Sequence, residues 1–349
     1  MKKALLTTAL VGSLVSGMSA ANAATSISGN LAISYFATSN DSGSTINTDK
    51  SYNGFGSESQ INLAASGDLN NGMKYAAGFS WEIDGTESLG GTAKDDFNAT
   101  HEGTYIEFIS GGTTIGLMAD RDSSLDGLGV NFAGFGYRQV KGVGTSITNT
   151  SYGTDSNFGF GVRQAIGEGS LNAFYAPNTG FGLTQDIGNG ATKATIDKGE
   201  HYYSLTYVGK VAGANVKVGM NETAGVGGTK TDQKAYGAQI DYTFGKTKVG
   251  ISRGKFENSE TIGAASNEQT TTEVGVAQAL SDTLTAGLTY TKTDGSISTA
   301  VENEVIVTAA LGYNLGPVSV QLQYKNATDI GGVKGVDASQ LGMYVATKF

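Results

Sequence analysis

The chain of 349 residues contains no cysteine and only two prolines. The absence of cysteine excludes a small disulfide-stabilised exported domain and any cysteine-ligated metal centre. Proline cannot donate to a strand ladder and is kept out of central strands, so its scarcity suits a protein made of many paired strands. No stretch reaches the roughly 20 mostly apolar residues that a membrane-spanning helix needs.

Basic residues are also in short supply. The chain carries 23 Lys and Arg against 32 Asp and Glu, for a formal net charge of −9. Nucleic-acid binding depends on clustered cations that neutralise phosphates, so this balance argues against a nucleic-acid partner. Glycine, by contrast, is abundant at 52 residues, which suits tight turns, bulges and close packing on one face of a sheet.

The N-terminus has the pattern of a secretory signal peptide. Two lysines are followed by the short, mostly apolar run 4–15 and by a small-x-small cleavage site at residues 21–23. We therefore predict a signal peptide over residues 1–23 and a mature barrel domain over residues 24–349. A membrane anchor is the weaker alternative, because the run is too short to span a bilayer. Loss of the two lysines takes the formal charge from −9 to −11.

Apolar and polar side chains alternate along most of the mature chain, up to its last residue. At the C-terminus, Leu341, Met343 and Val345 fall on one face, with Gln340 and Gly342 on the other. Successive strand side chains point to opposite faces, so each such segment is predicted to be a strand. The segments are Ser26–Ala37, Ser57–Leu69, Met73–Asp84, Glu102–Ser110, Thr113–Asp120, Asn157–Ile166, Ser170–Ala176, His201–Gly209, Ala214–Asn221, Lys234–Phe244, Lys246–Arg253, Thr271–Leu280, Thr283–Thr291, Glu304–Leu315, Val318–Asn326 and Ala338–Phe349.

The connections between these segments alternate between short turns, such as Gly111-Gly112, and long polar stretches, such as 177–200. An even number of strands with this asymmetry is typical of bacterial membrane barrels. The sequence therefore predicts an all-β fold, a 16-stranded antiparallel transmembrane β-barrel with short periplasmic turns and long external loops. The longest connection, Arg121–Ser156, contains several aromatic residues and is predicted to fold inward as the third loop.

The chain resembles the Gram-negative porin family. The resemblance rests on the signal peptide ending at Ala23, the hairpin order, the long third loop and the closing segment Leu341–Phe349. It covers the whole mature chain and includes no catalytic motif. It implies a homotrimer in the outer membrane of a Gram-negative bacterium, in contact with lipid and lipopolysaccharide. Each barrel would be a water-filled channel for passive diffusion of ions and small hydrophilic solutes.

The closing segment also resembles the signal that the barrel-assembly machinery reads. The apolar positions that carry it are Leu341, Met343, Val345 and Phe349. Thr347 departs from the pattern, because a stronger apolar residue is usual at that position.

Charged residues that alternate with the apolar positions are predicted to line the lumen. These wall residues are Lys74, Glu82, Glu107, Arg163, Lys217, Asp241, Lys248, Glu273 and Lys325. An error of one residue in register would move any of them to the outer face. Those nearest the narrowest level would shape the field across the pore, and the others would be solvated wall residues.

The third loop carries the predicted constriction charges. They are Asp120, Asp122, Asp126, Arg138 and Lys141. Carboxylates attract cations, so the cluster predicts a weak cation preference. A solvated acidic turn and a Ca²⁺ site remain alternatives, although Asn131 stands where an EF-hand loop needs its twelfth-position glutamate. We expect no cofactor.

The sequence predicts no enzyme. His101 and His201 each adjoin a carboxylate, but strand neighbours point to opposite faces and do not form a dyad. Two other functions remain open. A substrate-selective channel would need a line of aromatic or paired basic residues along the lumen, and an exported β-rich adhesin would lack an apolar belt.

Overall fold

The computed structural model describes residues 24–40, 51–86, 96–119, 158–176, 201–226, 231–259, 267–294, 302–330 and 334–349. The predicted signal peptide, 1–23, lies outside these residues. The described chain forms β1 (Ala24–Asn40), β2 (Ser51–Asp68), β3 (Lys74–Thr86), β4 (Asp96–Ser110), β5 (Thr113–Ala119), β6 (Phe158–Ile166), β7 (Gly169–Ala176), β8 (His201–Val211), β9 (Ala214–Val226), β10 (Thr231–Phe244), β11 (Thr247–Ser259), β12 (Asn267–Ala279), β13 (Leu284–Asp294), β14 (Glu304–Leu315), β15 (Val318–Thr328) and β16 (Ala338–Lys348).

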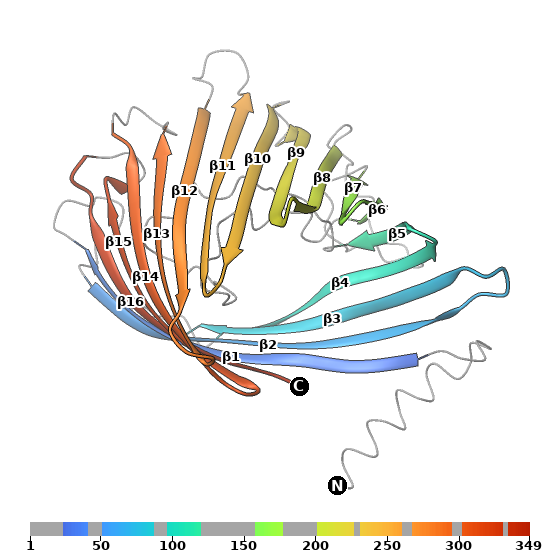
Figure 1. The fold of residues 1–349 in the computed structure, drawn as a ribbon, viewed down its shortest axis with the longest axis horizontal. Helices are drawn as coiled ribbons and strands as arrows, with labels where there is room; N and C mark the ends of the chain where they lie inside the picture. Colours follow the sequence, from blue (N-terminus) through green and yellow to red (C-terminus); the bar gives the residue numbers. More distant parts are fainter. Residues whose placement is uncertain are drawn as a thin grey trace, which may run out of the picture.

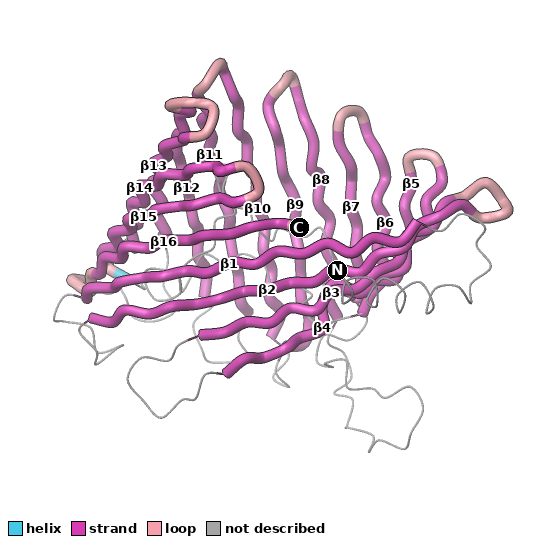
Figure 2. The backbone as a smooth tube through the Cα atoms, turned by 90° about the horizontal axis from the view of Figure 1, so that it is seen from below, coloured by secondary structure: helices cyan, strands magenta, loops and turns pink. Residues whose placement is uncertain are grey.

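Each strand pairs with its sequence neighbours, and β1 pairs antiparallel with β16, which closes the sheet into a barrel (Figure 1). The short turns of the hairpins gather at one end of the strands (Figure 2). We call this end the turn end and the opposite one the loop end. The predicted fold class, a closed antiparallel barrel of sixteen strands, is confirmed. No helix in the described part of the chain is long and apolar enough to cross a membrane.

The two faces of the barrel differ in chemistry. Large apolar side chains point outward and are exposed, as in Ile240 and Tyr242 on β10 and Leu288 and Tyr290 on β13. The residues between them, such as Asp241, point into the barrel. A soluble protein would bury these apolar rows, so a continuous exposed apolar surface indicates a lipid-facing wall.

The apolar outer band ends in ion pairs toward the loop end. On the outer face of β9–β13, Nζ of Lys255 lies 2.7 Å from Oε1 of Glu257 and 2.9 Å from Oε1 of Glu268. Further along the same rim, Nζ of Lys292 lies 2.6 Å from Oδ1 of Asp294. Charges are costly on a lipid-facing surface near the membrane midplane, so these pairs mark the level at which the wall leaves the apolar layer.

Several strands are longer than the sequence pattern predicts. β2 begins at Ser51 rather than Ser57, β4 at Asp96 rather than Glu102, and β12 at Asn267 rather than Thr271. The extra residues all lie at the loop end. Apolar and polar side chains alternate only where one face of the strand meets lipid. Beyond the apolar band both faces of the strand meet water, so the alternation stops there although the backbone hydrogen bonds continue.

The barrel closes at the chain end. The backbone N–H of Gly29 donates to the carbonyl oxygen of Phe349 at 2.9 Å, and the N–H of Phe349 donates to Gly29 at 3.1 Å. The Phe349 ring occupies the outer-face space that a side chain on residue 29 would fill. The last residue is therefore part of the ladder that joins β16 to β1.

Candidate functional site: the inner wall

The inner face of the barrel is mostly polar. Its buried uncharged polar side chains include Thr38, Asn172, Ser204, Thr206, Asn221, Ser252, Thr308, Gln321, Gln323 and Gln340. Polar groups removed from bulk water need hydrogen-bond partners, so side-chain networks are expected along this wall. Three such groups surround charged residues.

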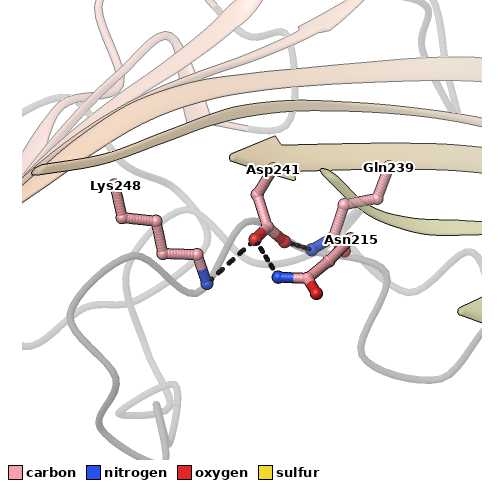
Figure 3. A network of polar contacts seen from close by, with 4 residues as sticks. All are labelled: Asn215, Gln239, Asp241 and Lys248. Carbon is pink, nitrogen blue, oxygen red and sulfur yellow. Dashed lines mark hydrogen bonds and ion pairs between the residues drawn. The ribbon is translucent and has the colours of Figure 1, made fainter. Parts of the chain in front are cut away.

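The first group is centred on Asp241 of β10, which is 4% exposed (Figure 3). Its carboxylate accepts hydrogen bonds from Nδ2 of Asn215 at 2.7 Å and from Nε2 of Gln239 at 3.2 Å. Nζ of Lys248 on β11 lies 3.4 Å from Oδ2 of Asp241. A buried carboxylate requires a partner of opposite charge and hydrogen bonds, and this network supplies both. The result is a fixed, locally neutral pair on the wall.

Gly250 makes room for this group. It pairs directly with Asp241 across β10 and β11. A Cβ atom on residue 250 would lie 2.7 Å from Cβ of Asp241 and 2.7 Å from the carbonyl oxygen of Ile240. The absence of a side chain at residue 250 therefore allows Asp241 to take its position.

The second group orients Arg163 of β6. Its Nε donates to Oδ1 of Asn172 on β7 at 3.1 Å. Nδ2 of Asn172 in turn donates to the backbone oxygen of Thr206 on β8 at 3.2 Å. The buried amide thus links three strands and fixes the guanidinium on the inner wall.

The third group lies on β12–β16. Lys325, 2% exposed, interacts electrostatically with Glu304 and Glu273. Oγ1 of Thr291 donates to Oε2 of Glu273 at 3.0 Å. Beside this group, Ile330 of the β15–β16 connection packs against three residues of the inner wall, Ile306, Ala327 and Ala338. The described part of that connection therefore folds over the wall.

Aromatic side chains on the inner wall form a compact patch. The ring centroids of Phe174 on β7 and Tyr202 on β8 are 6.2 Å apart. Both side chains are buried, and Tyr105 of β4 packs against them with Ala176. This patch is confined to one part of the wall. A substrate-selective channel needs instead a line of aromatic residues along the pore.

The structure places the predicted wall residues on the inner face. Each is flanked along its strand by outward-pointing residues, as Glu107 is by Ile106 and Phe108 and as Lys217 is by Val218. The inner-face residues are Lys74, Glu82, Glu107, Arg163, Lys217, Asp241, Lys248, Glu273 and Lys325. Five of them belong to the three groups described above: Arg163, Asp241, Lys248, Glu273 and Lys325. The predicted constriction residues Asp120, Asp122, Asp126, Arg138 and Lys141 lie outside the described residues.

Sequence reasoning missed the uncharged partners. Asn172, Asn215, Gln239 and Gln340 each make a side-chain hydrogen bond on the inner wall. Their signal was present, because every one alternates with outward-pointing neighbours. A search restricted to charged residues passes over amides at the same face positions.

No group of three or more His, Asp or Glu residues able to hold a metal ion occurs among the described residues. His201 stacks with Tyr203 on the outer face, with ring centroids 6.4 Å apart and an interplanar angle of 17°. The acidic turn considered for Ca²⁺ lies outside the described residues.

Sequence comparison identifies the family. The family profile described as Gram-negative porin matches residues 6–342, nearly the whole chain. The chain belongs to the Gram-negative porin family. No curated protein matches this porin.

Solved structures share its fold. An anion-selective porin from Comamonas acidovorans superposes with a TM-score of 0.67 at 16% identity, covering 94% of this chain and 100% of that one. OmpF of Salmonella typhi, solved with daunomycin, gives a TM-score of 0.64 at 12% identity, covering 93% and 97%. The trimer form of OmpT, an outer-membrane protein of Vibrio cholerae, gives 0.59 at 14%, covering 94% and 99%.

Family and architecture agree on the general activity. A closed barrel with an apolar outer wall and a polar inner wall is a transmembrane channel, and the porin family places it in the outer membrane.

Proposed function

We propose that this porin is a water-filled, non-enzymatic channel for passive diffusion of ions and small hydrophilic solutes, with a weak preference for cations. The observation that carries the proposal is the polar, charged inner wall of a closed sixteen-stranded barrel. Sixteen strands are enough to leave an aqueous interior. Nothing in this function requires a bound cofactor, because sieving by diameter and bias by wall charge are sufficient.

The cation preference rests on the third loop. Asp120, Asp122 and Asp126 stand together at its start, and Arg138 and Lys141 follow in the same loop. Basic wall residues such as Arg163 offset these acids in part. The preference should therefore be modest, and it should weaken with salt because the Debye length is about 8 Å at physiological ionic strength.

We expect the double variant Asp122→Asn/Asp126→Asn to shift the reversal potential in a KCl gradient toward anions, with little change in conductance. Removing two carboxylates from a constriction lowers the local cation concentration while leaving its diameter almost unchanged. The measurement is a planar-bilayer recording at low salt.

The matched control removes two carboxylates from the outer face. Glu268→Gln/Asp294→Asn makes the same change in net charge outside the pore and should leave the reversal potential unchanged. If the loop variant also leaves it unchanged at low salt, the loop acids lie outside the constriction and the wall charges set the selectivity.

We also propose a homotrimer in the outer membrane of a Gram-negative bacterium, with the turn end in the periplasm, assembled by the barrel-assembly machinery among lipid and lipopolysaccharide. The trimer form of the fold relative OmpT supports the oligomeric state. In bilayer recordings, insertion events that each add three equal conductance steps would support the trimer. Insertion events that add a single step, recorded with the cross-linked native oligomer, would contradict it.

A substrate-selective channel is the competing function. The compact aromatic patch at Phe174 and Tyr202 is the feature closest to its requirement, but both rings are buried. A solute that blocks the open channel at low concentration would favour this alternative.

A further inference from the structure

The charges on the inner wall are sorted along the pore axis. In the turn-end half, basic residues predominate. Lys74 begins β3 beside its turn, Lys248 follows the first residue of β11, and Lys217 stands near the start of β9. Arg163 lies in the turn-side half of β6, and Lys348 ends β16 on the inner face opposite Asn30.

Acidic residues in this half are fewer. They are Asp68, Glu107 and Asp241, each on the turn side of its strand. The charge of Asp241 is offset directly by Lys248 at 3.4 Å. The wall near the turns is therefore net positive.

The loop-end half has the opposite composition. Glu82 lies on the loop side of β3, and Glu304 begins β14 at that end. Glu58 stands near the middle of β2, where its Oε1 accepts a hydrogen bond from Nδ2 of Asn30 at 3.4 Å. Glu273 stands at the middle of β12. Lys325 is the one basic residue on the inner face of this half among the residues that the structure describes, and it interacts with Glu304 and Glu273.

Along the described inner wall, the lumen thus passes from a loop-end half with more acidic residues to a turn-end half with more basic residues. We call these two halves the acidic mouth and the basic mouth.

We propose that this porin rectifies: its inner wall is a bipolar charge junction that conducts more current when the loop side is positive. The inference rests on the proposed function, because it requires an open aqueous channel. The residues that carry it are Lys74, Lys217 and Arg163 on the turn side and Glu82 on the loop side, with Glu58 near the middle of its strand.

The direction follows from the mobile ions. Cations concentrate beside the acidic mouth and anions beside the basic mouth. A positive potential on the loop side drives both kinds of ion toward the middle of the pore, where they accumulate and raise the conductance. The reverse potential pulls both away and depletes the middle. A difference of about one kT between the two halves predicts a current ratio of about two at matched voltages.

The test is the current–voltage curve of single channels in symmetric KCl. At 0.1 M salt the Debye length is about 10 Å and the junction should rectify, whereas at 1 M it is about 3 Å and the curve should be linear. Orientation is read with Asn70→Cys, because the chain has no cysteine of its own and Asn70 lies in the exposed β2–β3 turn. Biotin-maleimide labelling, followed by streptavidin in one chamber, identifies the side on which the turns lie.

The decisive variant is Lys74→Gln/Arg163→Gln/Lys217→Gln, which neutralises the basic mouth and should bring the current ratio close to one. Its matched control is Arg253→Gln/Lys255→Gln/Lys292→Gln, which removes three cations from the outer face and should leave the ratio unchanged. Glu58→Gln/Glu82→Gln tests the acidic part of the wall independently and should also reduce the ratio.

The recordings distinguish failure of the charge junction from failure of the channel function. A channel with a linear curve at 0.1 M, or with larger current when the loop side is negative, overturns the junction while leaving the channel function intact. An unchanged ratio in both inner-wall variants also overturns it. Absence of any conductance would overturn the proposed function instead.

Discussion

Deletion of Phe349 is expected to reduce the amount of assembled barrel strongly while leaving barrels that do form almost normal in stability. The deletion removes two backbone hydrogen bonds to Gly29 and the ring contact beside them. Hydrogen bonds of this kind contribute about 1 kcal/mol each, a small part of the stability of a closed sheet. Phe349 is, however, 67% exposed on the outer face, where an assembly factor can reach it before closure.

The measurement is the heat-modifiable, folded fraction in outer-membrane preparations, compared with the midpoint of urea unfolding of the purified barrel. Phe349→Tyr keeps the ring and the ladder and serves as the control, with near-normal levels expected. Normal outer-membrane levels of the truncated protein would show that the terminal residue is not read during assembly.

Leu288→Arg is expected to destabilise the barrel by about 2–4 kcal/mol in a bilayer, the usual effect of arginine on the lipid face near the midplane. Leu288 is 49% exposed on the outer face of β13. It lies between the row of Leu284 and Tyr313 toward the turn end and Tyr290 toward the loop end, so aromatic residues flank it on both sides. The free energy of unfolding from lipid vesicles gives the value directly.

The adjacent residue provides the control. Thr289 points into the barrel opposite Gly275 and Thr308. Thr289→Arg makes a comparable change in size and charge in the wet lumen, and its effect on stability should stay within about 0.5 kcal/mol. Equal losses for the two variants would contradict the assignment of the two faces.

The architecture could be predicted from the sequence because lipid and water act on alternate residues. Val274 and Val276 meet an apolar environment while Glu273 and Gly275 meet a polar one, and this contrast repeats in strand after strand. Strand number and face assignment follow from the alternation alone. The strand ends of β2, β4 and β12 did not follow, because beyond the apolar layer the two faces meet the same solvent.

The partners of the wall charges could not be predicted in the same way. Asp241 on β10 meets Asn215 from β9 and Lys248 from β11, and the register of two hairpins decides which side chains lie within hydrogen-bond distance. A shift of one residue would separate them. The chain carries the residue types, but their distances depend on pairing and on the space left by Gly250.

By itself, the sequence determined the class of this protein, a porin-like barrel with an apolar outside and a charged inside, because a two-residue period records which solvent each face meets. The tertiary structure decided which charges neutralise one another and how those that remain are distributed along the axis. Electrostatic interactions depend on distance, and only closure of the sheet and the register of its hairpins set those distances.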